Sequence, residues 1–387
     1  MKNPINPFLT LVVLSLLCGV SSARELAKER VIGTLEVVAT FPDAMPTGVT
    51  VSNSGRIFVN FPRWGDPVDY TVGEVKNGQV IPYPDAGINR YDRDENQADK
   101  LISVQSVVVD PDGERLWILD TGSIQFEPVR PGGPKLIAVD LKTNHVGEKI
   151  LFPPDVVLPT SYVNDVRSDL RRGNEGVAFI TDSTSLGPNG IIVVDLASGK
   201  SWRRLHDHPS TKPDPAFVPV VEGEILQMRL PGQPPARFAV GSDGIAISPD
   251  GKSLYYCPLS SRHLYSVSAD ALADRNKSDA DVAATVKDLG EKGGASDGLE
   301  SDAQGRVYLS DYEHNAIRRW SSSTEIQTLV HDPRVLWPDT LSLACDGYLY
   351  FTANQVERQG VFHNGQDLRQ KPYVLFRVKV DGTRIQN

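Results

Sequence analysis

One sequence phrase recurs six times along the chain and constrains the fold more than any other feature. Each copy has a polar start, an alternation of apolar residues, a turn that contains Gly or Asn, and a second stretch rich in aromatic and β-branched residues. Two alternating runs that flank a tight turn predict a β-hairpin. A further strand candidate follows most copies, so each repeat predicts an antiparallel sheet of three or four strands. The copies start at Gly48, Ser106, Asp165, Asp243, Asp297 and Asp339.

Six sheets of this kind predict an all-β fold, the six-bladed β-propeller. A single sheet leaves one face unburied, whereas six radial sheets each pack against the next and leave only short edges. The same architecture accounts for a length of 387 residues, because a single core stops growing near ~250–300 residues. Residues 373–380 alternate as a strand and are predicted to pair with an N-terminal strand at 35–40, which closes the ring. Two separate β-sandwiches would not repeat one phrase six times.

The first 23 residues have the composition of a secretory signal peptide. Lys2 is the only charged residue among them, an apolar run extends from Phe8 to Val20, and Ser21-Ser22-Ala23 offers small residues for cleavage. This run is too short for a membrane span, which needs roughly 20 residues. We therefore expect a secreted or periplasmic protein with the signal peptide at 1–23 and the propeller at 24–387; the alternative is a retained N-terminal anchor.

Charge and cysteine content narrow the class of partner. Lys and Arg number 40 against 49 Asp and Glu, a net charge of −9, so the chain lacks the basic surplus that nucleic-acid binding requires. We expect no nucleic-acid partner, no stable membrane anchor and a monomer.

Cys257 and Cys345 lie in strand-like segments of different repeats. This placement favours two buried free thiols, although an exported protein could pair them.

Polar residues at the starts of the repeats are the candidate site. The innermost strands of a propeller line its central channel, so their first residues should face one another at one end of that channel. The candidate ligand-binding residues there are Asn164, Asp165, Asp243, Asp297 and Asp339. Converging carboxylates repel unless a proton or a cation neutralises them, which makes Ca²⁺ or another divalent cation a candidate cofactor. The alternative is that each Asp only caps a local turn.

The Arg63-Trp64 pair and Glu300 each have a functional and a structural interpretation. Arg63-Trp64 could hold a planar ligand by stacking, or the Arg stem could simply cover a packed Trp. Glu300, in the fifth repeat, could act as an acid or base, or could be a buried partner of an Arg. The chain has no Gly-x-Ser-x-Gly, His-Glu-x-x-His or Cys-x-x-Cys motif. We therefore assign no catalytic residue.

Several of these segments together resemble the yellow / major royal jelly protein family, whose bacterial members are often described as related to dopachrome tautomerase. The resemblance implies a secreted six-bladed propeller that binds small molecules at its axial opening. Insect members are associated with pigment chemistry, biogenic amine binding or sterol binding. The segments that carry it are 56–64, 105–110, 116–122, 243–248, 255–261, 296–300 and 337–340, of which Pro62-Arg63-Trp64 and the Cys257–Ser261 segment are the more specific.

The candidate metal ligands rest on a second similarity. Asp243, Asp297 and Asn164 are similar in position to the metal ligands and polar neighbour of gluconolactonase-type propellers. The chain departs from those proteins at Pro46-Thr47-Gly48, where they carry a glutamate. Our leading hypothesis is therefore a propeller that binds a small aromatic or amine-bearing molecule in its axial pocket. The alternative is an enzyme, either a dopachrome-type tautomerase or a metal-dependent lactone hydrolase.

Overall fold

The structure is a computed structural model that describes Met1 and residues 30–386, without the side chains of residues 324 and 325. The chain divides into residues 1–30 and residues 31–387, and the second unit carries the whole fold. Apart from Met1, the predicted signal peptide at 1–23 lies outside the described residues. No helix in the described part of the chain is long and apolar enough to cross a membrane.

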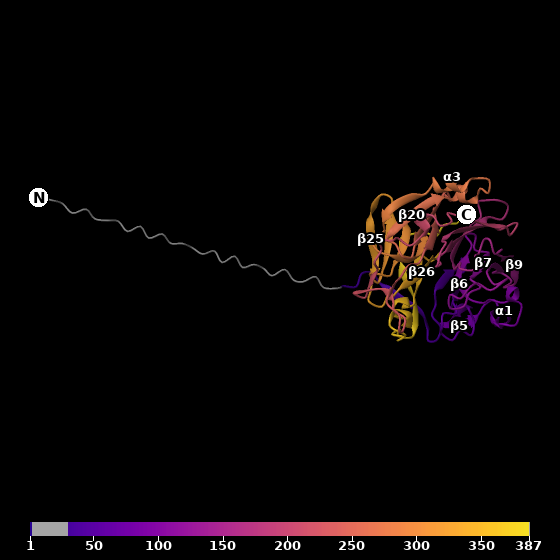
Figure 1. Cartoon of the computed structure of the whole chain (residues 1–387), viewed down its shortest axis with the longest axis horizontal. Coiled ribbons are helices and arrows are strands. Elements are labelled where there is room, and N and C mark those ends of the chain that lie inside the picture. The colour runs from indigo at the N-terminus through magenta and orange to yellow at the C-terminus, as the bar shows by residue number, and fades with distance from the viewer. Residues whose placement is uncertain (2–29, 387) are drawn as a thin grey trace. The chain divides into compact units, whose positions relative to one another are not determined.

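Residues 31–386 form a six-bladed β-propeller, as predicted (Figure 1). Each blade is an antiparallel sheet of four strands. The first three blades are β2 (Gly48–Val51), β3 (Ile57–Asn60), β4 (Val72–Lys76) and β5 (Gln79–Pro82); β6 (Val104–Val109), β7 (Arg115–Asp120), β8 (Lys135–Asp140) and β9 (Val146–Leu151); and β10 (Val163–Asp169), β11 (Val177–Asp182), β12 (Gly190–Asp195) and β13 (Ser201–Arg204).

The remaining three blades complete the ring. They are β18 (Ser242–Ile247), β19 (Ser253–Pro258), β20 (His263–Ser268) and β21 (Lys287–Glu291); β22 (Ser296–Ser301), β23 (Val307–Asp311), β24 (Ala316–Ser321) and β25 (Thr324–His331); and β26 (Pro338–Leu343), β27 (Tyr348–Ala353), β28 (Tyr373–Lys379) and β1 (Leu35–Phe41). In the last blade the N-terminal strand β1 pairs antiparallel with β28. The predicted closure of the ring is therefore confirmed.

The six innermost strands surround the propeller axis. Each contacts the next in the order β2, β6, β10, β18, β22 and β26, and β26 contacts β2 again. All six run in the same direction, so their first residues meet at one end of the axis and their last residues at the other. We call these the start end and the finish end of the channel.

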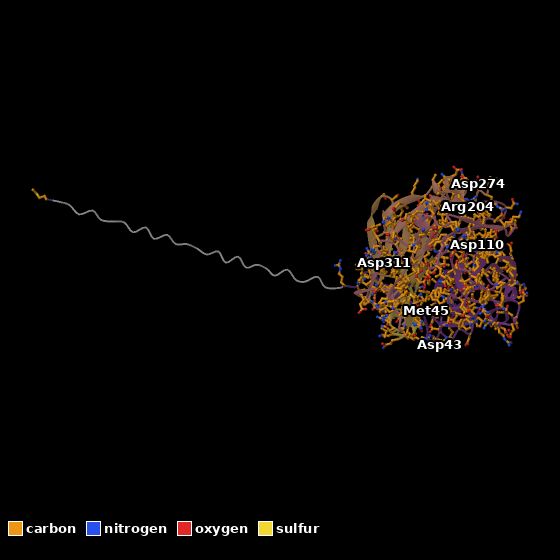
Figure 2. The ribbon with its side chains drawn as sticks, viewed as in Figure 1. Asp43, Met45, Asp110, Arg204, Asp274 and Asp311 are labelled. Atoms are coloured by element: carbon orange, nitrogen blue, oxygen red, sulfur yellow. The ribbon has the colours of Figure 1, made fainter. Side chains whose placement is uncertain are left out.

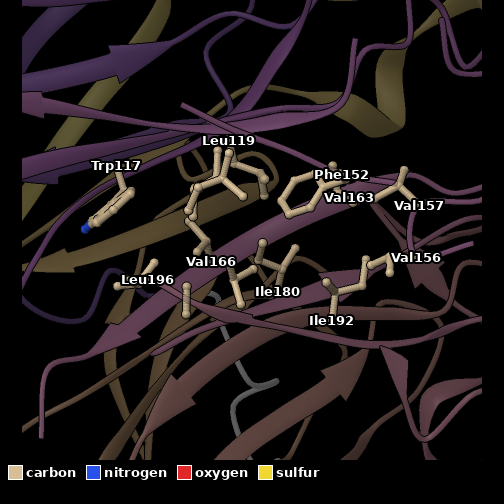
Figure 3. Close-up of a cluster of buried hydrophobic side chains, with 14 of the residues drawn as sticks. Trp117, Leu119, Phe152, Val156, Val157, Val163, Val166, Ile180, Ile192 and Leu196 are labelled. Atoms are coloured by element: carbon tan, nitrogen blue, oxygen red, sulfur yellow. The ribbon is translucent and has the colours of Figure 1, made fainter. Parts of the chain in front are cut away.

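Apolar side chains between neighbouring blades hold the ring together. The cluster between the second and third blades joins Trp117 and Leu119 of β7 to Val166 of β10 and Ile180 of β11, all of them buried (Figure 3). Such blade-to-blade cores replace a single central core, because each sheet buries its face against its neighbour.

The segments that lie outside the repeated hairpins form short strands and helices. The insertion after β13 forms two small hairpins, β14 (Val220–Val221) with β15 (Glu224–Ile225) and β16 (Gln227–Met228) with β17 (Ala236–Arg237). Residues 268–283 contain two short helices, α2 (Ala269–Ala273) and α3 (Asp279–Ala283). The polar stretch at 60–100 supplies the outer strands β4 and β5 together with the short helix α1 (Ala86–Asn89).

Cys257 and Cys345 are both free, but they differ in burial. Cys257 is buried in the core between the fourth and fifth blades, as predicted. Cys345 is exposed, which corrects the expectation of two buried thiols. Cys345 lies two residues after the end of β26 and precedes Asp346-Gly347 of the hairpin turn, where the chain turns at the surface.

Candidate functional site

Three aspartates meet at the start end of the channel. Asp243, Asp297 and Asp339 are each the second residue of an inner strand, β18, β22 and β26, and all three are buried. The Asp297 carboxyl lies within hydrogen-bonding reach of both Asp243 and Asp339. We call these three residues the acid triad, with Asp297 at its centre.

A local irregularity in each strand aims these side chains at the axis. The register of β18, β22 and β26 with their neighbouring strands shifts across the residues that include Asp243, Asp297 and Asp339. Such bulges turn a side chain away from the regular pleat. The inner strands β6 and β10 show similar shifts, whereas the pairing of β2 is regular.

The glycines that follow two of these aspartates allow close packing. A Cβ atom at Gly244 would lie 2.3 Å from the backbone oxygen of Asp297, and one at Gly298 would lie 2.5 Å from that of Asp339. Each Asp-Gly pair therefore brings one inner strand against the next, and the packing sets the carboxyls side by side. This arrangement differs from the alternative in which each Asp only caps a local turn.

Burial raises the pKa of all three carboxyls. The pKa values of Asp243 and Asp339 are well above the usual range because of burial and the adjacent Asp297 carboxyl. Burial likewise raises the pKa of Asp297, although hydrogen bonds from Trp337 and from the two neighbouring carboxyls oppose this. Like charges in contact cannot all ionise, so the triad holds protons between its carboxyls.

Neutral side chains supply the remaining hydrogen bonds of the triad. The Asn164 amide donates to Asp243 Oδ1. Trp337 Nε1 donates to Asp297 Oδ2 at 2.7 Å, and Asn354 Nδ2 donates to Asp339 Oδ2 at 2.7 Å. In the part of the chain that the structure describes, no Lys or Arg forms an ion pair with any of the three.

Asp165, the fourth predicted carboxyl, lies near the triad but has a different environment. Its Oδ1 accepts hydrogen bonds from Ser106 Oγ and Arg167 Nη1, both at 2.8 Å, so its charge is paired. Its other oxygen, Oδ2, is buried without a partner. The predicted convergence therefore includes Asn164 and Asp165 together with the triad.

Aromatic side chains flank the triad on one side. Trp337 stacks on Tyr312 with ring centroids 4.1 Å apart. Its backbone φ is 50°, a left-handed conformation that is costly for a bulky residue and is found most often at functional sites. Phe238 of the insertion meets Trp337 edge-on.

A second aromatic group contains the predicted Trp64. Trp64 Nε1 donates to the hydroxyl of Tyr162 at 2.7 Å, and its ring stacks on Phe126 at 5.1 Å. Tyr162 is buried two residues before Asn164, and its pKa is raised well above the usual range by burial and, less strongly, by the charges of Asp243 and Asp339. Phe126 is 60% exposed at the outer side of this group.

Arg63 does not join Trp64 in this arrangement. Its guanidinium donates to the backbone oxygens of Ile102 and Val68 and lies 5.4 Å from the ring of Tyr91. Arg63 thus binds loop backbone, and the stacking of a planar ligand by Arg63 and Trp64 stays a prediction. Adjacent residues point in different directions here, and the backbone carbonyls of the loop satisfy the charged group.

The donor set gives the calcium prediction no support. Ca²⁺ takes six to eight oxygen ligands. Among residues 30–386 no group of three or more His, Cys, Asp and Glu side chains is arranged to hold a metal ion. Asn164 directs its amide nitrogen, a donor, at Asp243. A metal held by Asp243, Asp297 and Asn164 therefore stays a prediction.

Sequence reasoning missed three members of the site. Trp337, Asn354 and Tyr162 all lie next to inner or second strands, outside the repeated phrase. A signal existed for Trp337, which directly precedes the Pro338-Asp339 start of the sixth copy. Asn354 and Tyr162 carry no comparable signal, because their positions differ from one repeat to the next.

One protein-family profile matches most of the propeller. The family profile described as "Major royal jelly protein" matches residues 102–381. The chain belongs to the major royal jelly protein family. The match extends from just before β6 to just after β28 and so includes the acid triad.

The relatives of this family member include the insect yellow proteins. It is 26% identical over 313 residues to Protein yellow of Drosophila erecta and also to Protein yellow of Drosophila melanogaster, an alignment that covers 75% of this chain and 53% of each relative. The chain thus spans about half the length of the curated relatives it matches.

Solved structures similar to this major royal jelly protein family member are also propellers. A luciferin-regenerating enzyme superposes with a TM-score of 0.53 at 11% identity, covering 92% of this chain and 99% of that one. Regucalcin, a calcium-binding protein of Agrobacterium tumefaciens, gives 0.52 at 13% identity over 91% and 98% of the two chains. A gluconolactonase of Xanthomonas campestris gives 0.50 at 12% identity over 90% and 98%. At these identities the likeness concerns the fold alone.

Proposed function

We propose that the protein binds a small molecule that carries a protonated amine and an aromatic ring, with the amine at the acid triad. The observation that carries this proposal is a cluster of three buried carboxyls with no cationic side chain bound to any of them in the described residues. Buried charges are normally paired, because removal from water is costly. A ligand ammonium would supply the missing partner and allow the carboxyls to ionise.

The surroundings support an aromatic component in the ligand. Trp64, Phe126 and Tyr162 form a continuous group whose rings lie 4.8–6.2 Å from one another. Trp337 lies against the triad itself. Aromatic faces attract cations and stack on planar rings. We also propose that binding takes place outside the cytoplasm, a proposal supported by the apolar run that follows Lys2.

Calorimetry with an arylalkylamine tests the proposal. We expect tryptamine to bind and tryptophol, which has a hydroxyl in place of the amine, to bind far more weakly. Because the triad holds protons when empty, amine binding should release protons. The enthalpy should therefore vary with the ionisation enthalpy of the buffer, and the affinity should rise as pH increases from about 5 to about 8.

Matched variants separate the two parts of the ligand. Trp64→Leu should weaken tryptamine binding but leave the binding of butylamine, which has no ring, nearly unchanged. Asp250→Asn, an exposed hairpin-turn aspartate, should change neither. Equal binding of tryptamine and tryptophol, or binding without proton exchange, would contradict an amine at the triad. Competition of Ca²⁺ with tryptamine would support the prediction of a metal ion at the triad.

A second candidate function is acid–base isomerisation of the dopachrome type. The specific observation in its favour is the set of contacting carboxyls with raised pKa values, an arrangement typical of acid–base pairs. Asp297 is in contact with both other carboxyls, so Asp297→Asn should reduce dopachrome decay by about 10²-fold or more if Asp297 transfers the proton. An unchanged rate in this variant would exclude the carboxyl as the catalytic group.

A further inference from the structure

A cavity lies at the finish end of the channel, away from the acid triad. Its volume is about 80 Å³, room for about five water-sized groups. All six inner strands contribute to its lining through their last residues, from Thr50 of β2 to Ser342 of β26. Ser301 lies four positions after Asp297 along β22, which places the cavity roughly 13 Å from the triad.

Two buried polar groups that line this cavity have no hydrogen-bond partner. Arg167 is 8% exposed and Ser168 is 6% exposed. Arg167 Nε and Ser168 Oγ are buried, and neither bonds to another group. An unsatisfied buried polar group is costly, so two unpaired polar groups at one place indicate that something outside the protein chain satisfies them.

The unpaired hydroxyl of Ser168 is an exception among the hydroxyls at this level. Thr50 Oγ1 accepts from the backbone of Val109, and Ser342 Oγ accepts from the backbone of Val51. Ser301 Oγ donates to the backbone oxygen of Ile247. Each of these three bonds links one inner strand to its neighbour. Ser168 forms no such link, which leaves its hydroxyl available to a ligand.

Arg167 presents one edge of its guanidinium for a planar acceptor. Nη1 donates to Asp165 and to the backbone oxygen of Val166. Nη2 donates to the backbone oxygen of Leu299 at 2.8 Å, on β22, so the side chain crosses the channel. Nη2 has a second hydrogen and shares its edge with the free Nε–H. A carboxylate accepts from two such donors side by side.

A second arginine reaches the cavity from the C-terminus. Residues 381–386 cross the fifth blade, where Asp302 and Arg384 form an isolated bridge, and we call them the C-terminal strap. The Arg384 guanidinium donates to the backbone oxygens of Val51, Val109 and Asp110. In the described residues Arg384 has no carboxylate ion-pair partner.

We propose that this cavity binds a small carboxylate anion between Arg167, Ser168 and Arg384. The carboxylate would accept from Arg167 Nε and from Ser168 Oγ, and the Arg384 charge would lie over it. Glu300 also lines the cavity, accepts a hydrogen bond from the backbone of Ser301, and interacts electrostatically with Arg167 and Arg384. Burial raises the pKa of the Glu300 carboxyl, which lessens its repulsion of an anion. No feature of this site depends on the proposed amine ligand.

Thermal melting and calorimetry of the full chain with sodium acetate test this proposal. The measurements use a buffer without carboxylate near pH 7, with chloride replacing acetate at constant ionic strength. We expect acetate, but not chloride, to raise the melting temperature in a saturable way. Ser168→Ala removes a hydroxyl that has no partner, so it should leave the melting temperature unchanged without acetate and should weaken acetate binding about threefold or more.

Three further variants test which side chains contribute to acetate binding. Arg384→Gln should weaken acetate binding about tenfold or more, and Glu300→Gln should strengthen it. Arg275→Gln, an exposed arginine beside Trp202, should have no effect. Equal melting in acetate and chloride would mean that the cavity holds only water and would overturn the proposal. Acetate binding that is unaltered by both Ser168→Ala and Arg384→Gln would overturn it as well.

Discussion

Asp243→Asn is expected to stabilise the protein above neutral pH while abolishing amine binding. The asparagine amide can donate to Asp297, as the protonated Asp243 carboxyl does, and its oxygen can still accept from Asn164. The side chain at position 243 therefore resembles the protonated aspartate but can no longer ionise. A site that keeps unpaired acids together at a cost in stability is typical of binding sites.

The pH dependence follows from the direction of the pKa shifts. Burial raises the pKa values of Asp243, Asp297 and Asp339 above their unfolded values. Their contribution to stability is thus fully present below the unfolded pKa of about 3.9 and is lost as pH rises through the folded values. Asp243→Asn removes one of these titrations. Its melting temperature should match the wild type near about pH 4 and exceed it by a few degrees near about pH 8.

A control separates this effect from a general change in charge. Asp250→Asn removes an exposed acid from a hairpin turn of the same blade. The pKa of Asp250 is lowered by its hydrogen bond from Ser248, so this variant should lose stability slightly above the unfolded pKa. If Asp243→Asn melted lower than the wild type near about pH 8, the carboxyl would be ionised and paired, and the account of the triad would be wrong.

The fold could be predicted because its elements repeat. The alternation and the turn glycines of each copy are local properties, and six copies leave few arrangements other than a ring. Closure by β1 and β28 was also predictable, since both strands alternate and no other partner was available. The strands β4 and β5 were not, because residues 72–82 lack a clean alternation of apolar and polar residues.

The site was predictable only where the repeat defines it. Asp243, Asp297 and Asp339 occupy equivalent positions in three copies, so the symmetry of the ring brings them together. Their partners Asn354 and Tyr162 come from loops that differ between blades, and the direction of Arg63 depends on nearby backbone carbonyls. The C-terminal strap lies outside the repeat, so no pattern indicated that Arg384 would reach the channel.

Other acids of the repeat stabilise individual blades, and they were not among the candidate binding residues predicted from the sequence. Asp120, Asp182 and Asp311 end the second strands β7, β11 and β23 and are buried (Figure 2 labels Asp311). Asp182 accepts from the backbone of Tyr162 and pairs with Arg203, and Asp311 pairs with Arg318. Unlike the triad, these carboxyls have cationic partners within their own blades.

Asp120→Ala is expected to lower the free energy of unfolding by about 3–5 kcal/mol. The Asp120 carboxylate accepts from the backbone N–H groups of Ile102, Ser103 and Gly122 at 2.7–3.0 Å. It also pairs with Lys135 Nζ at 2.8 Å, and both side chains are fully buried. Removing the carboxylate leaves the Lys135 ammonium buried without a counter-charge and frees three backbone donors. Urea unfolding followed by tryptophan fluorescence measures the loss.

A double variant separates two causes of the expected instability, the unpaired Lys135 charge and the lost hydrogen bonds from backbone N–H groups to Asp120. Asp120→Ala combined with Lys135→Met leaves no buried charge, so it should be more stable than Asp120→Ala alone. Lys135→Met alone should cost less than Asp120→Ala, because the three N–H bonds remain to compensate the carboxylate. Asp99→Asn breaks an exposed pair with Lys149 near the same blade and should leave the unfolding midpoint nearly unchanged. A double variant less stable than Asp120→Ala would show that the buried pair does not act through its charge.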